Sequence, residues 1–426
     1  MNSQRRRFLQ TLAAMGVSVT AAPLFADCKC LGGGRVVIVG GGYGGTTCAR
    51  YLRRLNPKIE VLLVEPDARY TSCPFSNLML AGIEPLPELR HDYRSLQDDH
   101  GVRVIHDCAV GIDTDIQVVK LASGAWLTYD RAVFSPGISF MWDSPVGYSR
   151  DTVTAMPHAW KAGRQTRILR DQLRAMDDGG VVAIAVPPKP FRCPPGPYER
   201  AGLIAWYLKQ HKPRSKVLIL DGNETFSKQD VFEEAWAQLY PGMIERVGVS
   251  GYGAVTRVDP ATNTLFTETD RHRVDVANVI PSQQAGRIAL ETGLADNSGW
   301  CPIDPHTFES SQLPKVHVIG DASIAYPIPK SASAANSEAK LCALAIVALL
   351  ADEAPPPASL HNTCYSMAAP DYGFSVNGIY DVRDGKINAI DRAGGVSPLA
   401  APASVRAQEA RHAHDWYASI VRDSFG

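Results

Sequence analysis

The sequence predicts an α/β protein with two Rossmann-like domains and a small C-terminal α+β domain. Three observations predict this fold class: a glycine-rich turn between a strand and a helix, a second strand-helix-strand unit in the middle of the chain, and a buried strand that ends in Gly320-Asp321. The chain has 426 residues, 45% hydrophobic and 20% charged, as is typical of a globular protein with two or three domains. Because its formal net charge is -1, we expect no nucleic-acid partner.

The first 26 residues have the pattern of an export signal. Arg5 and Arg6 precede an apolar stretch that ends at Ala26, a pattern that resembles a twin-arginine signal peptide. The stretch is too short to cross a bilayer, which needs about 20 apolar residues, and the later run Leu341 to Ala351 is also too short. We therefore expect a periplasmic mature protein with no integral membrane segment, in a compartment that permits disulfides.

The stretch Arg35 to Gly45 predicts the first half of a dinucleotide site. Val36 to Val39 predict a strand buried on both faces, and a helical pattern begins after the glycines. In such a turn Gly40 permits the sharp bend, Gly42 lets the backbone approach a pyrophosphate, and Gly45 lets the helix pack closely on the strand.

A second strand at 62–64 completes the unit. Glu65 follows this strand about 20 residues after the turn, where a carboxylate accepts hydrogen bonds from ribose hydroxyls. The alternative interpretation is an ordinary glycine-rich turn. Strand, helix, second strand and acid nevertheless follow in the order that a dinucleotide site requires.

The remainder of the first domain is predicted to close near residue 145. A turn-rich loop around Cys73 follows the second strand, where an active-site loop is expected. The next elements are a strand at 102–105, a hairpin around Ser123-Gly124, and a strand at 132–134 that leads to Gly137 and back toward the dinucleotide.

A second Rossmann-like domain is predicted over 146–283. Its expected elements are helices at 165–176, 200–209 and 230–239 and strands at 180–186, 216–220 and 274–280. The loop 187–199 contains six prolines where a nicotinamide site would need another glycine-rich turn. Because prolines lack the N–H donors of a phosphate cradle, we expect no NAD(P)H site in this domain.

The chain then returns to the first domain over 284–355. A buried strand from Val316 ends at Gly320 and Asp321, and this aspartate is placed to hold a ribityl hydroxyl of a flavin. Lys330 precedes the helix predicted at 334–350 and is expected to face the pyrimidine end of the flavin. A plain strand-end turn is the alternative. Residues 356–426 form the predicted C-terminal domain, after a proline-rich linker.

The nine cysteines fall into two groups. Six have ordinary interpretations: Cys48, Cys108 and Cys342 as buried structural thiols, Cys28 and Cys30 on a mobile tail, and Cys301 without an evident partner. Cys73, Cys193 and Cys364 stand in unusual contexts. The sequence has no Cys-x-x-Cys-His, so any c-type haem belongs to another chain, and we expect no metal site.

The order of several short motifs resembles the flavin-binding subunit of flavocytochrome c sulfide dehydrogenase across essentially the whole mature chain. These motifs are TSCPFSN, FRCPPGPYERA, FESS, VIGDAS, the Pro329-Lys330-Ser331 turn, NTCYS and the terminal DWYASIVRDSFG. The resemblance implies a flavoprotein of the glutathione reductase type with two dinucleotide domains. It also implies a C-terminal domain that contacts a cytochrome subunit.

The resemblance assigns roles to particular residues. FAD is expected to be bound covalently through its 8α-methyl group to Cys73, the alternative being a core thiol. Pro74-Phe75 departs from the pattern expected beside that cysteine. Cys193 and Cys364 are implied to form a redox disulfide that hydrosulfide attacks, with Glu199 as a proton acceptor. The alternatives are a structural disulfide and, for Glu199, a solvated carboxylate at a helix start.

The expected function is periplasmic oxidation of sulfide to sulfur or polysulfide by FAD, with electrons delivered to a c-type cytochrome. Two alternatives are an accessory flavoprotein of a sulfur-oxidation complex and a sulfide:quinone reductase. The latter normally has an amphipathic membrane-binding segment near its C-terminus, whereas residues 407–425 are strongly polar here. An NAD(P)H-dependent disulfide reductase is a third alternative.

Overall fold

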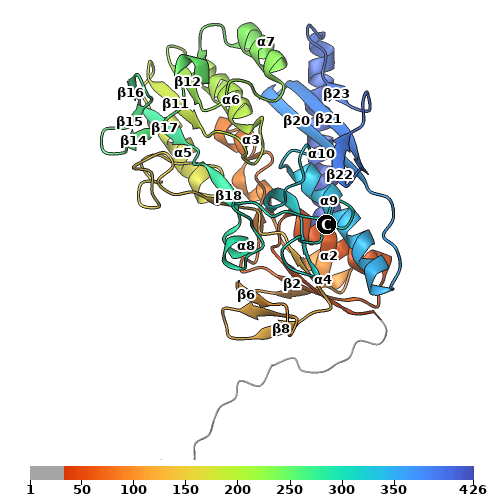
Figure 1. Cartoon of the computed structure of the whole chain (residues 1–426). Coiled ribbons are helices and arrows are strands. Elements are labelled where there is room, and N and C mark those ends of the chain that lie inside the picture. Colours follow the sequence, from red (N-terminus) through yellow and green to blue (C-terminus); the bar gives the residue numbers. More distant parts are fainter. Residues whose placement is uncertain (1–32) are drawn as a thin grey trace, which may run out of the picture.

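The computed structural model of the protein describes residues 33–426. The predicted signal peptide with Arg5 and Arg6, and also Cys28 and Cys30, lie outside the described residues. Figure 1 shows three parts: a first domain in red and orange that continues in cyan, a second domain in yellow and green, and a blue C-terminal part beside both.

The first domain is built on a five-stranded parallel sheet with the order β19-β9-β1-β2-β5. Its strands are β1 (Arg35–Val39), β2 (Glu60–Val64), β5 (Arg103–Ile105), β9 (Arg131–Phe134) and β19 (Val316–Val318). Val36, Val37 and Ile38 are 0% exposed, so β1 is covered on both faces as the aliphatic run predicts. The sheet takes strands from both 31–145 and 284–355, because β19 pairs with β9.

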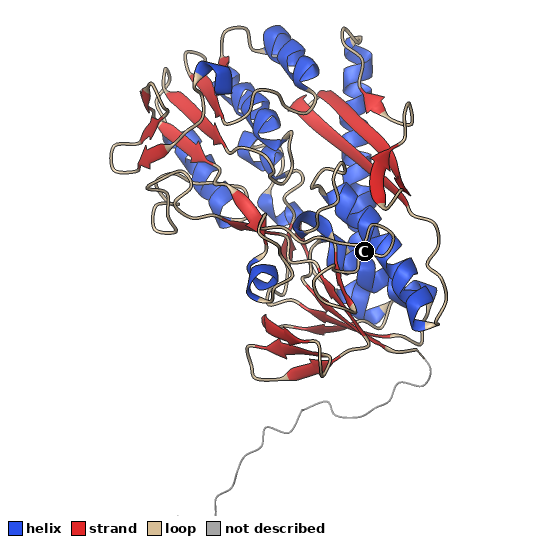
Figure 2. Ribbon diagram, in the orientation of Figure 1, coloured by secondary structure: helices blue, strands red, loops and turns tan. Residues whose placement is uncertain are grey.

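Two helices pack against each other beside this sheet (Figure 2). These are α2 (Tyr43–Leu55) and α9 (Ala332–Leu350). In this contact the buried side chains of Cys48 and Cys342 interact, and the Asn336 amide donates to Thr47 Oγ1 at 3.0 Å. Small side chains let the two helices approach closely, which fixes the N-terminus of α2 next to the loop before α9.

Helix α9 is the one described helix whose length and composition would allow it to cross a membrane, with a mean hydropathy of 1.4. It is a core helix in this fold, because 72% of that segment is buried. The predicted apolar run from Leu341 is shorter than the helix, which also includes the polar residues Asn336 and Lys340.

The second domain has a four-stranded parallel sheet with the order β13-β12-β11-β17. Its strands are β11 (Val181–Val186), β12 (Lys216–Asp221), β13 (Ile244–Val247) and β17 (Val276–Val279), and its helices are α5 (Arg164–Ala175), α6 (Gly196–His211) and α7 (Gln229–Leu239). Helix α6 begins four residues before the predicted start at Arg200. Its first turn contains Pro197. Proline is tolerated there because the first N–H groups of a helix have no partner within the helix.

Short elements connect and cover the two sheets. The three-stranded sheets are β6 (Ala109–Asp113), β7 (Val118–Leu121) and β8 (Trp126–Thr128), and β14 (Arg257–Asp259), β15 (Thr264–Phe266) and β16 (Arg271–Arg273). The two-stranded pairs are β3 (Tyr70–Thr71) with β4 (Arg90–His91), and β10 (Ile138–Phe140) with β18 (Gln283–Ala285). The remaining short helices are α3 (Ser76–Ala81), α4 (Arg94–Asp98), α8 (Arg287–Glu291), η1 (Leu86–Leu89), η2 (Val249–Gly251) and η3 (Gly320–Ala322).

The C-terminal part is an antiparallel sheet followed by a long helix. Its elements are β20 (Ser359–Ala369), β21 (Tyr372–Arg383), β22 (Lys386–Ala389), β23 (Gly395–Val396) and α10 (Ala403–Ser424). Helix α10 packs on β21 and β20 and also reaches α2. Two parallel α/β sheets with this C-terminal α+β part confirm the predicted fold class.

Candidate functional site

The glycine turn after β1 needs glycine at two positions for reasons within the protein. A Cβ on Gly45 would lie 1.8 Å from the carbonyl oxygen of Gly40. Gly40 has a φ of +105°, and its Cβ would lie 2.3 Å from the oxygen of Ser135. Both glycines therefore hold β1, α2 and β9 in close contact, as predicted for a dinucleotide turn.

Gly42 differs from its two neighbours. Its φ is -81°, and a Cβ there would make only ordinary contact with the Tyr70 ring at 3.5 Å. Nothing in the protein excludes a side chain at this position, so glycine is explained by close approach of a ligand. Gly42 caps α2 without a side-chain hydrogen bond, which leaves N–H groups of the first helical turn facing the cleft.

Glu65 at the end of β2 lies beside this turn. Its carboxylate accepts hydrogen bonds from the backbone N–H groups of Gly41 at 2.7 Å and Asp67 at 3.1 Å. Burial raises the pKa of Glu65, and these two donors partly offset the effect. The contacts hold the carboxylate at the cleft wall, where a ribose would lie.

The Gly320-Asp321 turn closes the cleft from the opposite side. The N–H of Gly320 donates to Glu338 Oε2 at 2.6 Å, and burial raises the pKa of this glutamate to about 8. Asp321 lies 3.8 Å from the guanidinium of Arg192, measured from carboxylate oxygen to nitrogen. Burial raises the pKa of Asp321, and the positive charge of Arg192 opposes that shift.

Lys330 is held by contacts with its own loop. Its ammonium donates to the carbonyl oxygens of Asp321 at 2.7 Å and Ser323 at 2.8 Å, and it lies 3.9 Å from the centre of the Trp300 ring. Because these groups hold the ammonium within the loop, Lys330 supports the Gly-Asp turn and is not part of the cleft wall.

These elements enclose a cleft of about 340 Å³. Its walls include Gly40, Gly42, Glu65, Cys73, Gly137 and Asp321. Ligand pockets commonly measure roughly 300–1,000 Å³, so this cleft has the size of a ligand-binding site. Gly42 and the free N-terminus of α2 leave room and N–H donors for phosphates, and the carboxylates of Glu65 and Asp321 can accept from hydroxyl groups. The residues present therefore fit FAD.

Replacing Gly42 by alanine tests this fit. The folded apoprotein should keep its circular dichroism spectrum and melting temperature, because the added Cβ makes ordinary contacts. The flavin-to-protein ratio should fall by about tenfold or more, since the methyl group occupies the approach to the phosphates. Gly45→Ala is the contrasting variant and should lose folded protein as well. A full flavin content in Gly42→Ala would contradict this assignment.

Cys73 connects the cleft to a second cavity. It precedes α3, and its Sγ is 3.7 Å from the carbonyl oxygen of Trp160. Cys73 and Arg192 line both the dinucleotide cleft and an adjoining cavity of about 100 Å³. A group bound in the cleft can therefore reach the adjoining cavity past Cys73.

The adjoining cavity contains Cys193 and Cys364, which are far apart in the sequence. Cys193 lies in the loop after β11 with a φ of 57°, and its N–H donates to the oxygen of Lys330 at 2.8 Å. Cys364 lies on β20. Burial raises the pKa of both thiols, and for Cys193 the next cause is the proximity of Cys364. Both are thiols in this structure.

Glu199 also lines this cavity, from the first turn of α6. Its Oε2 accepts from the Asn77 amide at 2.7 Å and its Oε1 accepts from the Met367 N–H at 3.0 Å. Burial raises the pKa of Glu199, and these two donors oppose the shift. The carboxylate is thus fixed between α3 and β20 and is not a solvated side chain.

Sequence reasoning missed Arg200, which is 2% exposed and next to Glu199. Its guanidinium donates to Asn77 Oδ1 and Asn278 Oδ1 and lies over the Trp160 ring. Burial lowers the pKa of Arg200 to about 10. A charged residue one position after the predicted acid was the available signal, but its burial depends on contacts with distant segments.

The C-terminal helix covers the cysteine cavity. Trp416 of α10 lines it, and Tyr417 stacks on Phe75 with ring centres 4.3 Å apart. These contacts place α10 over the segment that contains Cys73. Packed on α2 and β21, α10 is part of the folded body.

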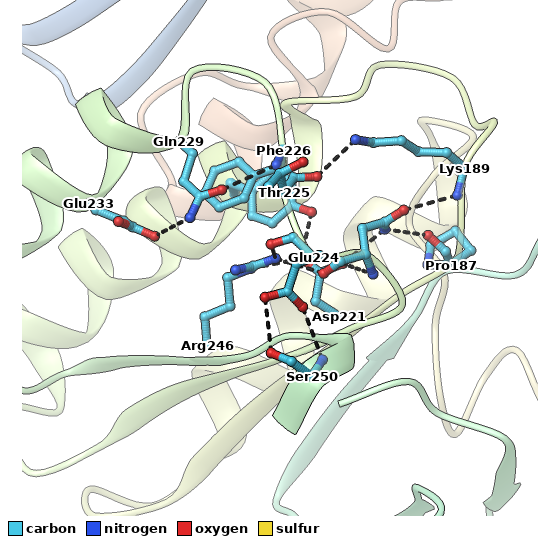
Figure 3. Close-up of polar contacts among 12 residues, drawn as sticks. Pro187, Lys189, Asp221, Glu224, Thr225, Phe226, Gln229, Glu233, Arg246 and Ser250 are labelled. Carbon is cyan, nitrogen blue, oxygen red and sulfur yellow. Dashed lines mark hydrogen bonds and ion pairs between the residues drawn. The ribbon is translucent and has the colours of Figure 1, made fainter. Parts of the chain in front are cut away.

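The end of β12 in the second domain is closed by the protein's own contacts (Figure 3). Asp221 is 0% exposed and accepts from Tyr198 Oη at 2.7 Å and Arg246 Nε at 2.8 Å. Its other oxygen accepts from the Asn223 N–H, and the Asn223 amide donates to the Pro187 carbonyl oxygen. The acid that would meet a ribose in a dinucleotide domain is therefore already paired.

The other described cysteines are placed as follows. Cys48, Cys301 and Cys342 are buried, and the burial predicted for Cys48 and Cys342 is confirmed. The expectation for Cys108 was wrong, because its side chain is exposed. Cys108 lies in the connection between β5 and β6, after the predicted strand has ended, so its side chain does not point into the core.

Three protein-family models match the chain. They are the central part of the sulfide dehydrogenase [flavocytochrome c] flavoprotein chain at 166–281, the flavin-binding part of flavocytochrome c sulphide dehydrogenase at 356–425, and pyridine nucleotide-disulphide oxidoreductase at 34–156. The first two models describe the same family, and their matched ranges contain Cys193 and Cys364, respectively.

Relatives and solved structures extend this likeness. The chain is 60% identical over 43 residues to the sulfide dehydrogenase [flavocytochrome c] flavoprotein chain of Chlorobaculum thiosulfatiphilum, which covers 10% of this chain and 90% of that one. It is 23% identical over 381 residues to the mitochondrial sulfide:quinone oxidoreductase of Mus musculus, and the match covers 83% of this chain and 80% of that protein. The sulfide:quinone oxidoreductase structure from Aquifex aeolicus superposes with a TM-score of 0.69 at 16% identity, covering 92% of each chain.

Proposed function

Because the chain belongs to the family of flavocytochrome c sulfide dehydrogenase flavoprotein chains, we propose that it oxidises hydrosulfide to sulfur or polysulfide and passes the electrons to a c-type cytochrome subunit. It is an oxidoreductase of this flavoprotein type. The observation that supports the proposed reaction most is the meeting of Cys193 and Cys364 in a cavity that adjoins the dinucleotide cleft at Cys73.

FAD, when bound, supplies a two-electron acceptor. The glycine turn and the N-terminus of α2 would hold its phosphates, Glu65 a ribose and Asp321 the ribityl chain. We propose that Cys73 is the covalent attachment point. Its position at the boundary of both cavities supports this role, since a tether there would hold one edge of the ring system toward the two cysteines.

In the proposed reaction, Cys193 and Cys364 start as a disulfide. Hydrosulfide attacks one sulfur, which forms a persulfide on that cysteine and releases the other as a thiolate. Glu199 accepts the proton of the outer persulfide sulfur when the persulfide is later discharged, because its carboxylate is fixed in the cavity by Asn77 and Met367. The raised pKa of Glu199 suits a group that must both take up and release a proton.

Replacing Glu199 by glutamine should lower the rate of flavin reduction by sulfide by about 10²-fold or more while flavin content stays unchanged. Glu199 accepts protons only when ionised, so the wild-type rate should fall as the pH drops through its raised pKa. The ratio of variant to wild-type rates removes the titration of hydrosulfide itself. This ratio should therefore rise toward low pH, and a ratio independent of pH would rule out the proton role.

A cytochrome partner and a periplasmic location complete the proposal. The sequence contains no Cys-x-x-Cys-His, so a c-type haem must be carried by another chain. The twin-arginine pattern at Arg5 and Arg6 supports export of the folded, flavin-loaded protein. The internal pairing of Asp221 and the proline-filled loop before α6 support a second domain that binds no nicotinamide.

Sulfide:quinone oxidoreductase activity is the second candidate, favoured by the similarity to the Mus musculus enzyme. Against it, α10 is occupied by contacts with α2 and β21 and contains many charged residues. An accessory role in a sulfur-oxidation complex is the remaining alternative.

Anaerobic titration of the flavin-loaded protein with sulfide distinguishes these functions. We expect bleaching of the oxidised flavin and reduction of an added c-type cytochrome. Bleaching without cytochrome reduction would favour the accessory role, and preferential reduction of a soluble quinone would favour the second candidate. Bleaching by NADH but not by sulfide would indicate a disulfide reductase.

A further inference from the structure

A buried lysine lies beside one of the two cavity cysteines. Lys228 precedes α7, has a φ of 64° and is 6% exposed. Non-glycine residues in this left-handed conformation are uncommon and occur often at functional sites. Figure 1 shows α7 and β20 at the same end of the molecule, and the two elements are in contact.

The ammonium of Lys228 is directed at β20. It donates to the carbonyl oxygen of Cys364 at 3.0 Å and to Ser366 Oγ at 2.8 Å, and it lies 3.8 Å from Cys364 Sγ. The rings of Phe232 and Phe374 lie within 6.0 Å on its other sides. Among residues 33–426, no carboxylate forms a salt bridge with it. The thiol of Cys364 is therefore an ionisable group in direct contact with this cation, whose charge also acts on Glu199.

Cys193 has no such contact. The guanidinium of Arg192 is engaged by the Trp160 oxygen and Asp321, and that of Arg200 by Asn77, Asn278 and backbone oxygens. Cys364 is acted on by Lys228 from the start of α7 and by Glu199 from α6, with opposite signs. For Cys193, the negative neighbours Cys364 and Glu199 outweigh Lys228 and Arg192. The two sulfurs are thus electrostatically unequal.

We propose that Lys228 is a positioning residue that makes Cys364 the leaving sulfur, so that hydrosulfide attacks Cys193 and the persulfide forms there. The inference rests on the proposed sulfide oxidation and assigns the direction of its first step.

The step is balanced without an additional oxidant. Hydrosulfide forms a new S–S bond to Cys193 Sγ, the Cys193–Cys364 bond breaks, and the bonding pair leaves on Cys364 Sγ as a thiolate. The hydrosulfide proton stays on the outer sulfur of the persulfide. Thiol–disulfide exchange favours departure of the thiol with the lower pKa, and an ammonium 3.8 Å from Cys364 Sγ stabilises that thiolate.

The site of the persulfide is the decisive measurement. Wild-type holoenzyme receives one equivalent of sulfide under anaerobic conditions, is quenched at once with an alkylating reagent, and is digested for mass spectrometry. We expect the alkylated persulfide on the Cys193 peptide and simple alkylation on the Cys364 peptide. A persulfide on Cys364 would overturn the inference. This measurement needs no variant, so a folding defect cannot obscure it.

Lys228→Met and Lys228→Arg test the role of the charge. An opposite charge in contact with an ionisable group shifts its pKa by about 1–3, so loss of the ammonium should raise the pKa of Cys364. With a Brønsted slope of about 0.5 between log rate and thiol pKa, flavin reduction in Lys228→Met should be roughly 3- to 30-fold slower. In the reduced variant, alkylation of Cys364 should shift to higher pH. Lys228→Arg should restore both properties, and the exposed Lys209→Met is the matched control.

The outcomes separate this inference from the function on which it rests. If sulfide neither bleaches wild-type flavin nor forms a persulfide on either cysteine, the proposed function fails. If wild type is bleached but the alkylation profile of Cys364 is the same in Lys228→Met, sulfide oxidation stands and the role of Lys228 is overturned.

Discussion

Flavin reduction by sulfide should be lost, by at least about a thousandfold, when either Cys193 or Cys364 is replaced by serine. A serine oxygen cannot take part in a disulfide, so neither variant can offer hydrosulfide an S–S bond to attack. Both side chains line the cavity beside Cys73, and serine is close to cysteine in size, so flavin content should be unchanged. Stopped-flow absorbance of the flavin measures the effect.

A double variant makes this test sharper. If the two sulfurs act as one unit, Cys193→Ser combined with Cys364→Ser should be no slower than either single variant. Cys108→Ser is the matched control, because its thiol is exposed and outside both cavities. A single variant that retains the wild-type rate would remove the disulfide from the mechanism, whatever the role of the flavin.

Local sequence signals predicted the parts of this protein that depend on local structure. The buried run of β1, the glycine turn and Glu65 follow from fixed spacings along one strand-helix-strand unit, and the structure places them around one cleft. Gly42 is informative in a further way. The structure shows that the protein itself does not require glycine there, which only the geometry of its surroundings can reveal.

The cysteine cavity could be predicted only in part. Its two sulfurs come from the loop after β11 and from β20, and no periodicity in the sequence indicates that these segments meet. Lys228 and Arg200 were missed for the same reason, since both are ordinary charged residues until folding buries them. Lys330 precedes α9 as predicted, and its ammonium donates to backbone oxygens at 2.7–2.8 Å, whereas its position toward the flavin stays a prediction.

Cys73→Ser should release the flavin from an otherwise folded protein. When wild-type protein is precipitated with acid, the yellow colour should stay in the pellet, because a thioether survives denaturation and non-covalent contacts do not. In the variant the colour should move to the supernatant. A serine hydroxyl does not ionise under conditions in which a cysteine forms a thiolate, so it cannot attach the flavin in the same way. Cys108→Ser should behave as wild type.

Cys73→Ser should remove the covalent link to the flavin without disturbing the rest of the cleft. Cys73 Sγ lies 3.7 Å from the Trp160 oxygen, and loss of this weak hydrogen bond costs little stability. The cleft contacts at Gly42, Glu65 and Asp321 remain in place, and the variant should still bind FAD reversibly. Colour released from acid-treated wild type would refute the tether while leaving the cleft assignment intact. The mass of the Cys73 peptide, with or without an added flavin, decides between the two outcomes.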